Sequence, residues 1–277
     1  MQNKIARVFP RRTKASPNDE LAFFDVPGLF PPLVNAVNIS VTFTWDIPRA
    51  EWLAKQWKHV ARVELGGPAF GKPSGDFVAG KYLKYGYTIT SRGCPNKCWF
   101  CKVWRREPRL IELPIQEGWN VLDDNLLACS ENHIKAVFEM LKRQPEKPQF
   151  TGGLEAKILK DWHVDLILSV KPKRIFLAYD TPDDYEPLVV AAKKIFDSGA
   201  LSKASNNVRA YVLMGWKEDT IEKALKRLQQ VLSIGVYPMP MVLRDDETGN
   251  RDPKWIKFAW PWSRPACIKK LKESIGM

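Results

Sequence analysis

The sequence predicts an α/β fold with a mostly parallel sheet, preceded by a small strand–helix–strand unit. Two patterns lead to this prediction. From residue 85 onward, six β-prone segments alternate with amphipathic helices, an order typical of a parallel sheet or a partial barrel. Before them, a strand, a helix and a second strand follow one another closely, which indicates one parallel βαβ unit. The chain has 277 residues, of which 45% are hydrophobic, enough for one large domain with a small appendage.

The N-terminal segment contains the βαβ unit. Residues 4–12, KIARVFPRR, predict a short strand, and residues 36–45 predict a longer strand rich in Val, Ile, Thr and Phe. Residues 48–58 predict a helix, because a proline stands at its first turn. Residues 59–71 predict the second strand of the unit, which ends in Gly-Gly-Pro, and residues 71–82 predict a loop.

The main sheet is predicted from short segments rich in β-branched and aromatic residues. They are YGYTIT (85–90), NVLDDNLLA (120–128), QFTGGLEA (149–156), RIFLAYD (174–180), VRAYVLMG (208–215) and VYPMPMVLR (236–244). Each segment is followed by residues typical of turns or helix starts. We therefore expect the carboxyl ends of these strands to share one edge of the sheet.

Four helices are predicted between these strands. Residues 130–144 have apolar residues at helical spacing and Ser130 as the expected N-cap. The others cover 159–170, 185–199 and 220–235, and the last two close on Gly199 and Gly235. The tail after residue 250 carries three tryptophans among basic residues. The predicted organisation is therefore residues 1–82, 83–249 and 250–277.

The charge and hydropathy patterns narrow the class of protein. The net charge of +12 favours polyanions such as RNA, DNA or acidic lipid, although an anionic small molecule or a basic proteome gives the same surplus. No run of about 18 apolar residues predicts a membrane span. The N-terminus lacks the apolar stretch of a signal peptide. We therefore predict a cytoplasmic, reducing location without a membrane partner.

Three of the five cysteines lie within eight residues, at Cys94, Cys98 and Cys101. This C-x3-C-x2-C spacing lets one loop surround a compact centre with three thiolates, which bind zinc or iron–sulfur clusters. A structural zinc site needs a fourth ligand, and the candidates are distant. They are Cys129, Cys267, His59, His133 and His163. The spacing favours an iron–sulfur site and leaves a zinc site or a metal-free loop open.

The segment CPNKCWFC resembles the signature of the radical S-adenosylmethionine superfamily, C-x3-C-x-φ-C, with Phe100 at the aromatic position. The resemblance covers residues 83–245 and is nearest to the cobalamin-dependent and methylthiotransferase-like branches. It implies a partial (β/α)6 barrel in which the three cysteines hold a [4Fe–4S] cluster. It also implies that S-adenosylmethionine binds the open iron, with the aromatic residue against adenine. An electron donor such as flavodoxin or ferredoxin then drives cleavage to a 5′-deoxyadenosyl radical.

The resemblance also implies cofactor contacts at the strand ends. VLDDN resembles the acidic end of the second strand, so Asp123, Asp124 or Asn125 is expected to accept hydrogen bonds from the cofactor's ammonium. The alternative is a turn or a helix cap. Glu155 in TGGLEA and Asp180 after RIFLAYD are further candidates, whose alternatives are a turn and a loop start.

The remaining features concern the substrate. The N-terminal unit resembles a fragment of the cobalamin-binding domain through ELGGPAF, so it is interpreted as a shortened remnant of that domain or a substrate-docking cap. Because the segment lacks Asp-x-His-x-x-Gly, a histidine ligand to cobalamin is not predicted. Basic residues around the cysteines predict an anionic substrate, with nucleic acid among the candidates. They are Lys81, Lys84, Arg92, Lys97, Lys102, Arg105, Arg106 and Arg109. The sequence indicates neither a catalytic residue nor the outcome of the radical step. The alternative function is a non-enzymatic, zinc-stabilised nucleic-acid-binding protein.

Overall fold

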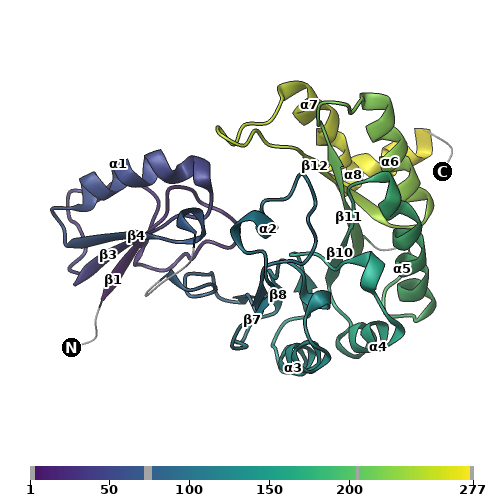
Figure 1. The fold of residues 1–277 in the computed structure, drawn as a ribbon, viewed down its shortest axis with the longest axis horizontal. Coiled ribbons are helices and arrows are strands. Elements are labelled where there is room, and N and C mark those ends of the chain that lie inside the picture. Colours follow the sequence, from purple (N-terminus) through teal and green to yellow (C-terminus); the bar gives the residue numbers. More distant parts are fainter. Residues whose placement is uncertain (1–3, 72–76, 204–205, 275–277) are drawn as a thin grey trace. The chain divides into compact units, whose positions relative to one another are not determined.

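The computed structural model of the chain describes residues 4–71, 77–203 and 206–274. The chain divides into two compact units (Figure 1). Unit 1 is Met1–Ile89 with Asp246–Thr248, and unit 2 is Thr90–Asp245 with Gly249–Met277. The division falls seven residues beyond the predicted boundary at residue 82, and the tail is part of unit 2. Part of the predicted loop at 71–82 lies outside the described residues.

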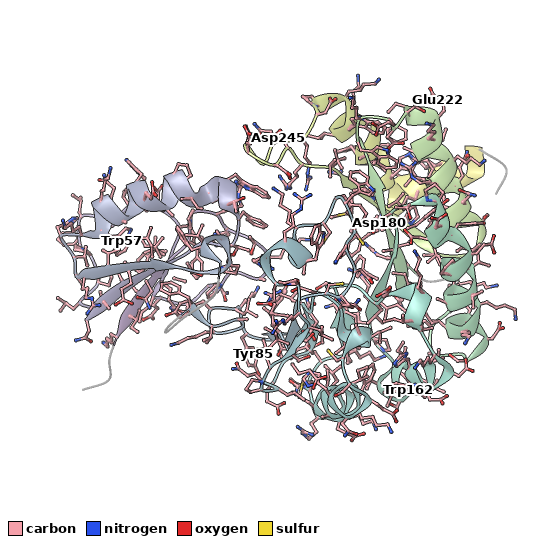
Figure 2. All side chains as sticks on the ribbon, in the orientation of Figure 1. Trp57, Tyr85, Trp162, Asp180, Glu222 and Asp245 are labelled. Atoms are coloured by element: carbon pink, nitrogen blue, oxygen red, sulfur yellow. The ribbon has the colours of Figure 1, made fainter. Side chains whose placement is uncertain are left out.

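Unit 1 is built on a parallel sheet with the strand order β2-β1-β3-β4. Its elements are β1 (Ile5–Val8), β2 (Ala22–Phe23), β3 (Ala36–Ser40), α1 (Ile47–Trp57) and β4 (Arg62–Gly66). Helix α1 packs Ala50, Leu53 and Trp57 against the apolar strand residues, and Trp57 is fully buried (Figure 2). The parallel pairing of β3 with β4 confirms the predicted βαβ unit.

The larger sheet has the strand order β12-β11-β10-β9-β8-β5. Its strands are β5 (Tyr87–Thr88), β8 (Asn120–Val121), β9 (Gln149–Phe150), β10 (Arg174–Tyr179), β11 (Val208–Met214) and β12 (Tyr237–Val242). All pairings from β8 to β12 are parallel, so the carboxyl ends of these strands lie at one edge. The structure therefore confirms an α/β fold with parallel sheets.

Four helices connect these strands: α3 (Glu131–Lys142), α4 (Asp161–Val170), α5 (Tyr185–Asp197) and α6 (Ile221–Ser233). In Figure 1 they lie along the outer side of the row of strands. Their apolar stripes, with residues such as Ile134, Ile167, Leu188 and Leu228, form one core with every second residue of β10 and β11. Ser130 caps α3 as predicted, because its side chain accepts a hydrogen bond from the His133 amide.

Several elements differ from the sequence-based expectation. Strands β5, β8 and β9 have two residues each and are shorter than the predicted segments. Thr90 and Thr151, which come after β5 and β9, donate hydrogen bonds to the side chains of Asp123 and Asn120. A two-stranded antiparallel ribbon of β6 (Ser91–Arg92) and β7 (Ile111–Glu112) was not predicted. Neither were the short α2 (Val103–Arg106), or α7 (Pro253–Trp262) and α8 (Pro265–Ser274) in the tail. Within the described residues, no helix has both the length and the apolar character required to cross a membrane.

Candidate cofactor site

The candidate residues meet at the carboxyl ends of the parallel strands. The cysteine loop follows β5 and β6, Asp123 to Asn125 follow β8, Glu155 follows β9, and Asp180 follows β10. In open parallel sheets, ligands bind outside these ends of the strands. The chain topology thus places every predicted site residue on one edge of unit 2.

The cysteine loop begins and ends at the β6–β7 ribbon, which pairs Ser91 with Glu112 and Arg92 with Ile111. Gly93 starts the loop with φ +85°, and a Cβ at this position would collide with the Arg109 carbonyl, so only glycine fits. Farther along, the Trp104 indole donates a hydrogen bond of 2.8 Å to the Cys98 carbonyl. The two ends and the middle of the loop are therefore fixed by the chain itself.

All three loop cysteines are free thiols and partly exposed. Burial, followed by the nearby Cys101 and Cys94, raises the pKa of Cys98 to about 11. The pKa of Cys101 is raised chiefly by burial and also by Cys94. The Cys101 amide also donates a hydrogen bond of 3.1 Å to the Cys98 carbonyl, so these two cysteines lie in one turn of the loop. Binding of a metal by such thiols must release protons, so affinity should increase with pH.

The described part of the chain contains no set of three His, Cys, Asp or Glu side chains already gathered in metal-ligand geometry. The three predicted cysteine ligands therefore share one loop but are not assembled into a ligand set. The donor chemistry nevertheless fits an iron–sulfur cluster, because three thiols on one loop are the ligands such a cluster takes. Two candidate zinc ligands contact other groups: His133 lies 3.4 Å from the Thr90 hydroxyl, and His163 accepts a hydrogen bond from the Lys160 amide.

Asn125 links the cysteine loop to the end of β9. Its Nδ2 donates to the Cys94 sulfur at 3.4 Å and to Glu155 Oε2 at 2.6 Å. The residue is 5% exposed, and its Oδ1 is buried without a hydrogen-bond partner. A buried acceptor without a partner is costly, so this atom is suited to a donor from a bound molecule. Two residues predicted from separate motifs, Asn125 and Glu155, are thus brought together beside a predicted cluster ligand.

Asp123 and Asp124 hold the start of the cysteine loop. The Asp123 carboxylate accepts hydrogen bonds from the Thr90 amide at 2.6 Å, the Thr90 hydroxyl at 2.5 Å and the Ser91 hydroxyl at 2.9 Å. Asp124 accepts from Arg92 at 3.1 Å and from the Gly93 amide at 2.9 Å. Their oxygens are already bonded to the loop, and a direct contact of either residue with a cofactor stays a prediction.

Asp180 follows β10 and is half-buried (Figure 2). Burial, and then the neighbouring Asp184, raises the pKa of Asp180 to about 7. Asp184 is held nearby because its carboxylate accepts from the Asp180 and Thr181 amides. Asp180 also contributes to the raised pKa of Cys98, which places it within electrostatic range of the cysteine loop.

This raised pKa predicts a pH-dependent effect of Asp180→Asn. The folded-state value of about 7 lies above the ordinary 3.8, so the group's contribution to stability is complete below pH 3.8 and is lost as pH rises through 7. The asparagine variant, which cannot ionise, should therefore gain stability relative to wild type between pH 5 and pH 8, by about 1 kcal/mol or more. Urea unfolding of both proteins at pH 5 and at pH 8 measures this difference in stability. Asp165→Asn, an exposed aspartate on α4, should show no such gain, and an equal gain there would contradict the assignment.

An aromatic cluster joins the middle of the loop to the residues after β11. Sequence reasoning predicted only Phe100 of this cluster as a site residue. Phe100 contacts Trp99 edge-on at 5.4 Å between ring centroids, and Trp99 contacts Trp216 at 6.0 Å. Trp216 follows β11 and was not predicted as a site residue. Arg227 lies 4.5 Å from the Trp216 ring and forms a buried ion pair with Asp219 at 2.7 Å. The sequence feature that could have identified Trp216 is its position just after the predicted strand 208–215. The predicted packing of Phe100 against adenine stays a prediction.

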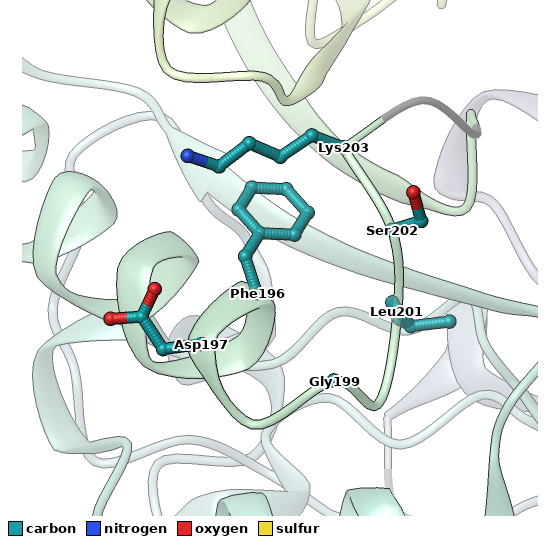
Figure 3. A pocket seen from close by; sticks show the side chains of 6 residues that line it. All are labelled: Phe196, Asp197, Gly199, Leu201, Ser202 and Lys203. Carbon is teal, nitrogen blue, oxygen red and sulfur yellow. The ribbon is translucent and has the colours of Figure 1, made fainter.

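A hollow of about 330 Å³ lies elsewhere in unit 2 (Figure 3). It is lined by Phe196, Asp197, Gly199, Leu201, Ser202 and Lys203. The Lys203 ammonium lies 5.6 Å from the centre of the Phe196 ring. These residues connect the end of α5 to the start of β11, so the hollow lies at the amino ends of the strands and is separate from the candidate site.

No protein-family model matches the chain. No curated protein matches it either.

Proposed function

We propose that this chain is a radical S-adenosylmethionine enzyme acting on an anionic substrate. The observation that carries the proposal is the contact of Asn125 with both Cys94 and Glu155, at the strand edge where the C-x3-C-x2-C loop lies. In this proposal Cys94, Cys98 and Cys101 hold a [4Fe–4S] cluster. When bound, the cluster and S-adenosylmethionine supply one-electron cleavage of the sulfonium to a 5′-deoxyadenosyl radical.

We further propose that the larger sheet is a partial (β/α)6 barrel. Its strands lie side by side in chain order, β5 and β8 to β12, without the reversal that characterises doubly wound sheets. Parallel strands in unbroken order, with right-handed connections, place all their helices on one side. The arrangement of α3 to α6 in Figure 1 supports this architecture.

The chain's own residues would bind and orient the cofactor. The free Oδ1 of Asn125 is suited to accept from the cofactor's ammonium, and the Glu155 carboxylate beside it adds a negative charge. Phe100, with Trp99 against Trp216, offers apolar surface that excludes water. Exposed basic side chains at Lys97, Arg105 and Arg109 favour an anionic substrate, nucleic acid among the candidates. An electron donor such as flavodoxin or ferredoxin would reduce the cluster.

Anaerobic reconstitution tests the proposal. The full chain is incubated with iron and sulfide, then reduced with dithionite in the presence of S-adenosylmethionine, and 5′-deoxyadenosine is measured by chromatography. We expect about four iron and four sulfide per chain, charge-transfer absorption and formation of 5′-deoxyadenosine. A chain without cluster absorption that holds one zinc tightly would overturn the proposal. With steeply salt-dependent RNA binding, it would instead support the zinc-stabilised binding protein.

A further inference from the structure

We propose that Arg174 and Arg209 form an anion site for a phosphate group on the face of the larger sheet that is turned away from helices α3 to α6. Val208, Ala210 and Val212 of β11 pack into the core with those helices. Side chains alternate along a strand, so Arg209 and Tyr211 lie on the opposite face. Arg209 lies 5.9 Å from the ring of Phe176, which places Phe176 and, two residues before it, Arg174 on the same face.

Neither guanidinium has a carboxylate partner in the described residues. Arg209 is 9% exposed, and its Nε donates to the Asn206 carbonyl at 3.1 Å. The Nε of Arg174 is buried without a hydrogen-bond partner. No ion pair joins either arginine to any carboxylate of residues 4–71, 77–203 and 206–274. The buried Arg209 and the half-buried Arg174 thus place two positive charges on one face without an ion-pair partner among these residues, whereas buried charges in proteins are normally paired.

The two arginines are close enough to act on one ligand. Phe176 pairs with Arg209 across β10 and β11, so Arg174 and Arg209 are diagonal neighbours on these strands. Burial lowers the pKa of Arg209, and the positive charge of Arg174 lowers it further, in agreement with this proximity. Two guanidiniums match the two charges and the several acceptor oxygens of a phosphate dianion, to which arginine binds through paired hydrogen bonds.

Polar side chains of the neighbouring strands lie beside the two arginines. This group of four residues is far from the cysteine loop. Gln149 of β9 pairs with Arg174, and Tyr237 of β12 pairs with Arg209, so amide and phenol groups flank the guanidiniums. All four residues lie at the amino ends of their strands. Six residues of extended β10 separate Arg174 from Asp180, about 20 Å. The anion site is therefore distinct from the candidate cofactor site, and it holds whether or not the proposed function does.

Isothermal titration of the full chain tests the site. Inorganic phosphate and glycerol 3-phosphate are titrated against sodium chloride of matched ionic strength. We expect saturable binding of phosphate to wild type, and binding at least about tenfold weaker in Arg209→Gln and in Arg174→Gln. Arg264→Gln is the matched control, because Arg264 also lies over an aromatic ring, 4.2 Å from Trp260, but is exposed. This control should bind phosphate as wild type does.

Circular dichroism establishes that each variant is folded. If Arg209→Gln does not fold, the half-buried Arg174 carries the test alone. Tighter binding of glycerol 3-phosphate than of inorganic phosphate would support a phosphate group carried by a larger molecule, and equal binding would support free phosphate. Absence of saturable binding to wild type, or equal binding by wild type and the folded glutamine variants, would overturn the proposal.

Discussion

Replacing Cys98 with alanine is expected to abolish cluster binding and reduce 5′-deoxyadenosine formation to background. Cys98 is the middle ligand of the proposed three, and its carbonyl is the point where Trp104 holds the loop. The carbonyl is unaffected by the substitution, so the loop should keep its fold while the ligand set falls to two. The measurements are iron and sulfide content, visible absorption and product formation after anaerobic reconstitution.

Cys129→Ala is the matched control. Cys129 is a buried, free cysteine of the same unit that follows the 3-10 turn Leu126–Ala128 and lies outside the loop. Its removal should leave iron content and product formation at wild-type levels, because a buried cysteine acts mainly as a small apolar side chain. Equal loss of iron in both variants, or full cluster content in Cys98→Ala, would contradict the assigned ligands.

Replacing Asp123 with alanine is expected to cost about 3 kcal/mol or more of unfolding free energy. Asp123 is 1% exposed, and its carboxylate accepts three hydrogen bonds from Thr90 and Ser91. The alanine variant leaves these donors buried without an acceptor, and each such donor costs about 1–3 kcal/mol. Because Thr90 and Ser91 lead directly into the cysteine loop, cluster content should fall as well. Urea unfolding and iron analysis measure the two effects.

Asp165→Ala removes an exposed carboxylate from α4 and controls for the loss of charge. Its effect should stay within about 0.5 kcal/mol. If Asp123→Ala unfolds at the same urea concentration as this control, the carboxylate does not anchor the loop, and the three hydrogen bonds contribute nothing measurable.

The helices were predictable because their signals are local. Helices α3, α5 and α6 follow the predicted segments closely, since Ser130 caps the first and Gly199 and Gly235, both at positive φ, follow the other two. The strand lengths were not predictable. Two residues after β5, the Thr90 amide donates to Asp123, 33 residues away, and no local pattern encodes a contact of that separation. In the tail, α7 was not predicted. It contains Pro261, and a proline inside a segment predicts a helix break.

The positions of the candidate site residues along the chain were predictable, but the hydrogen bonds between them were not. The rule that sites lie at strand ends located Asn125 and Glu155, yet their hydrogen bond joins residues 30 apart in the chain. Asp123 was one of three candidate cofactor contacts, with Asp124 and Asn125, that the resemblance of VLDDN implied. Its hydrogen bonds to Thr90 and Ser91, just before the loop, could not be read from that motif. Arg209 was missed entirely, because one arginine within an apolar strand gives no sign of which face it occupies or what neutralises it.

The β6–β7 ribbon holds the two ends of the cysteine loop together, whatever sequence lies between them. The loop begins after Arg92 and ends before Ile111, and these two residues pair directly with each other. An insertion between Arg105 and Arg109 therefore leaves both the ends of the loop and the Trp104 hydrogen bond to Cys98 where they are. Lengthening a flexible segment twofold costs only about 0.6 kcal/mol in closure entropy. Evolution, or an engineer, can thus alter what approaches the cysteines while the strands beneath them stay unchanged.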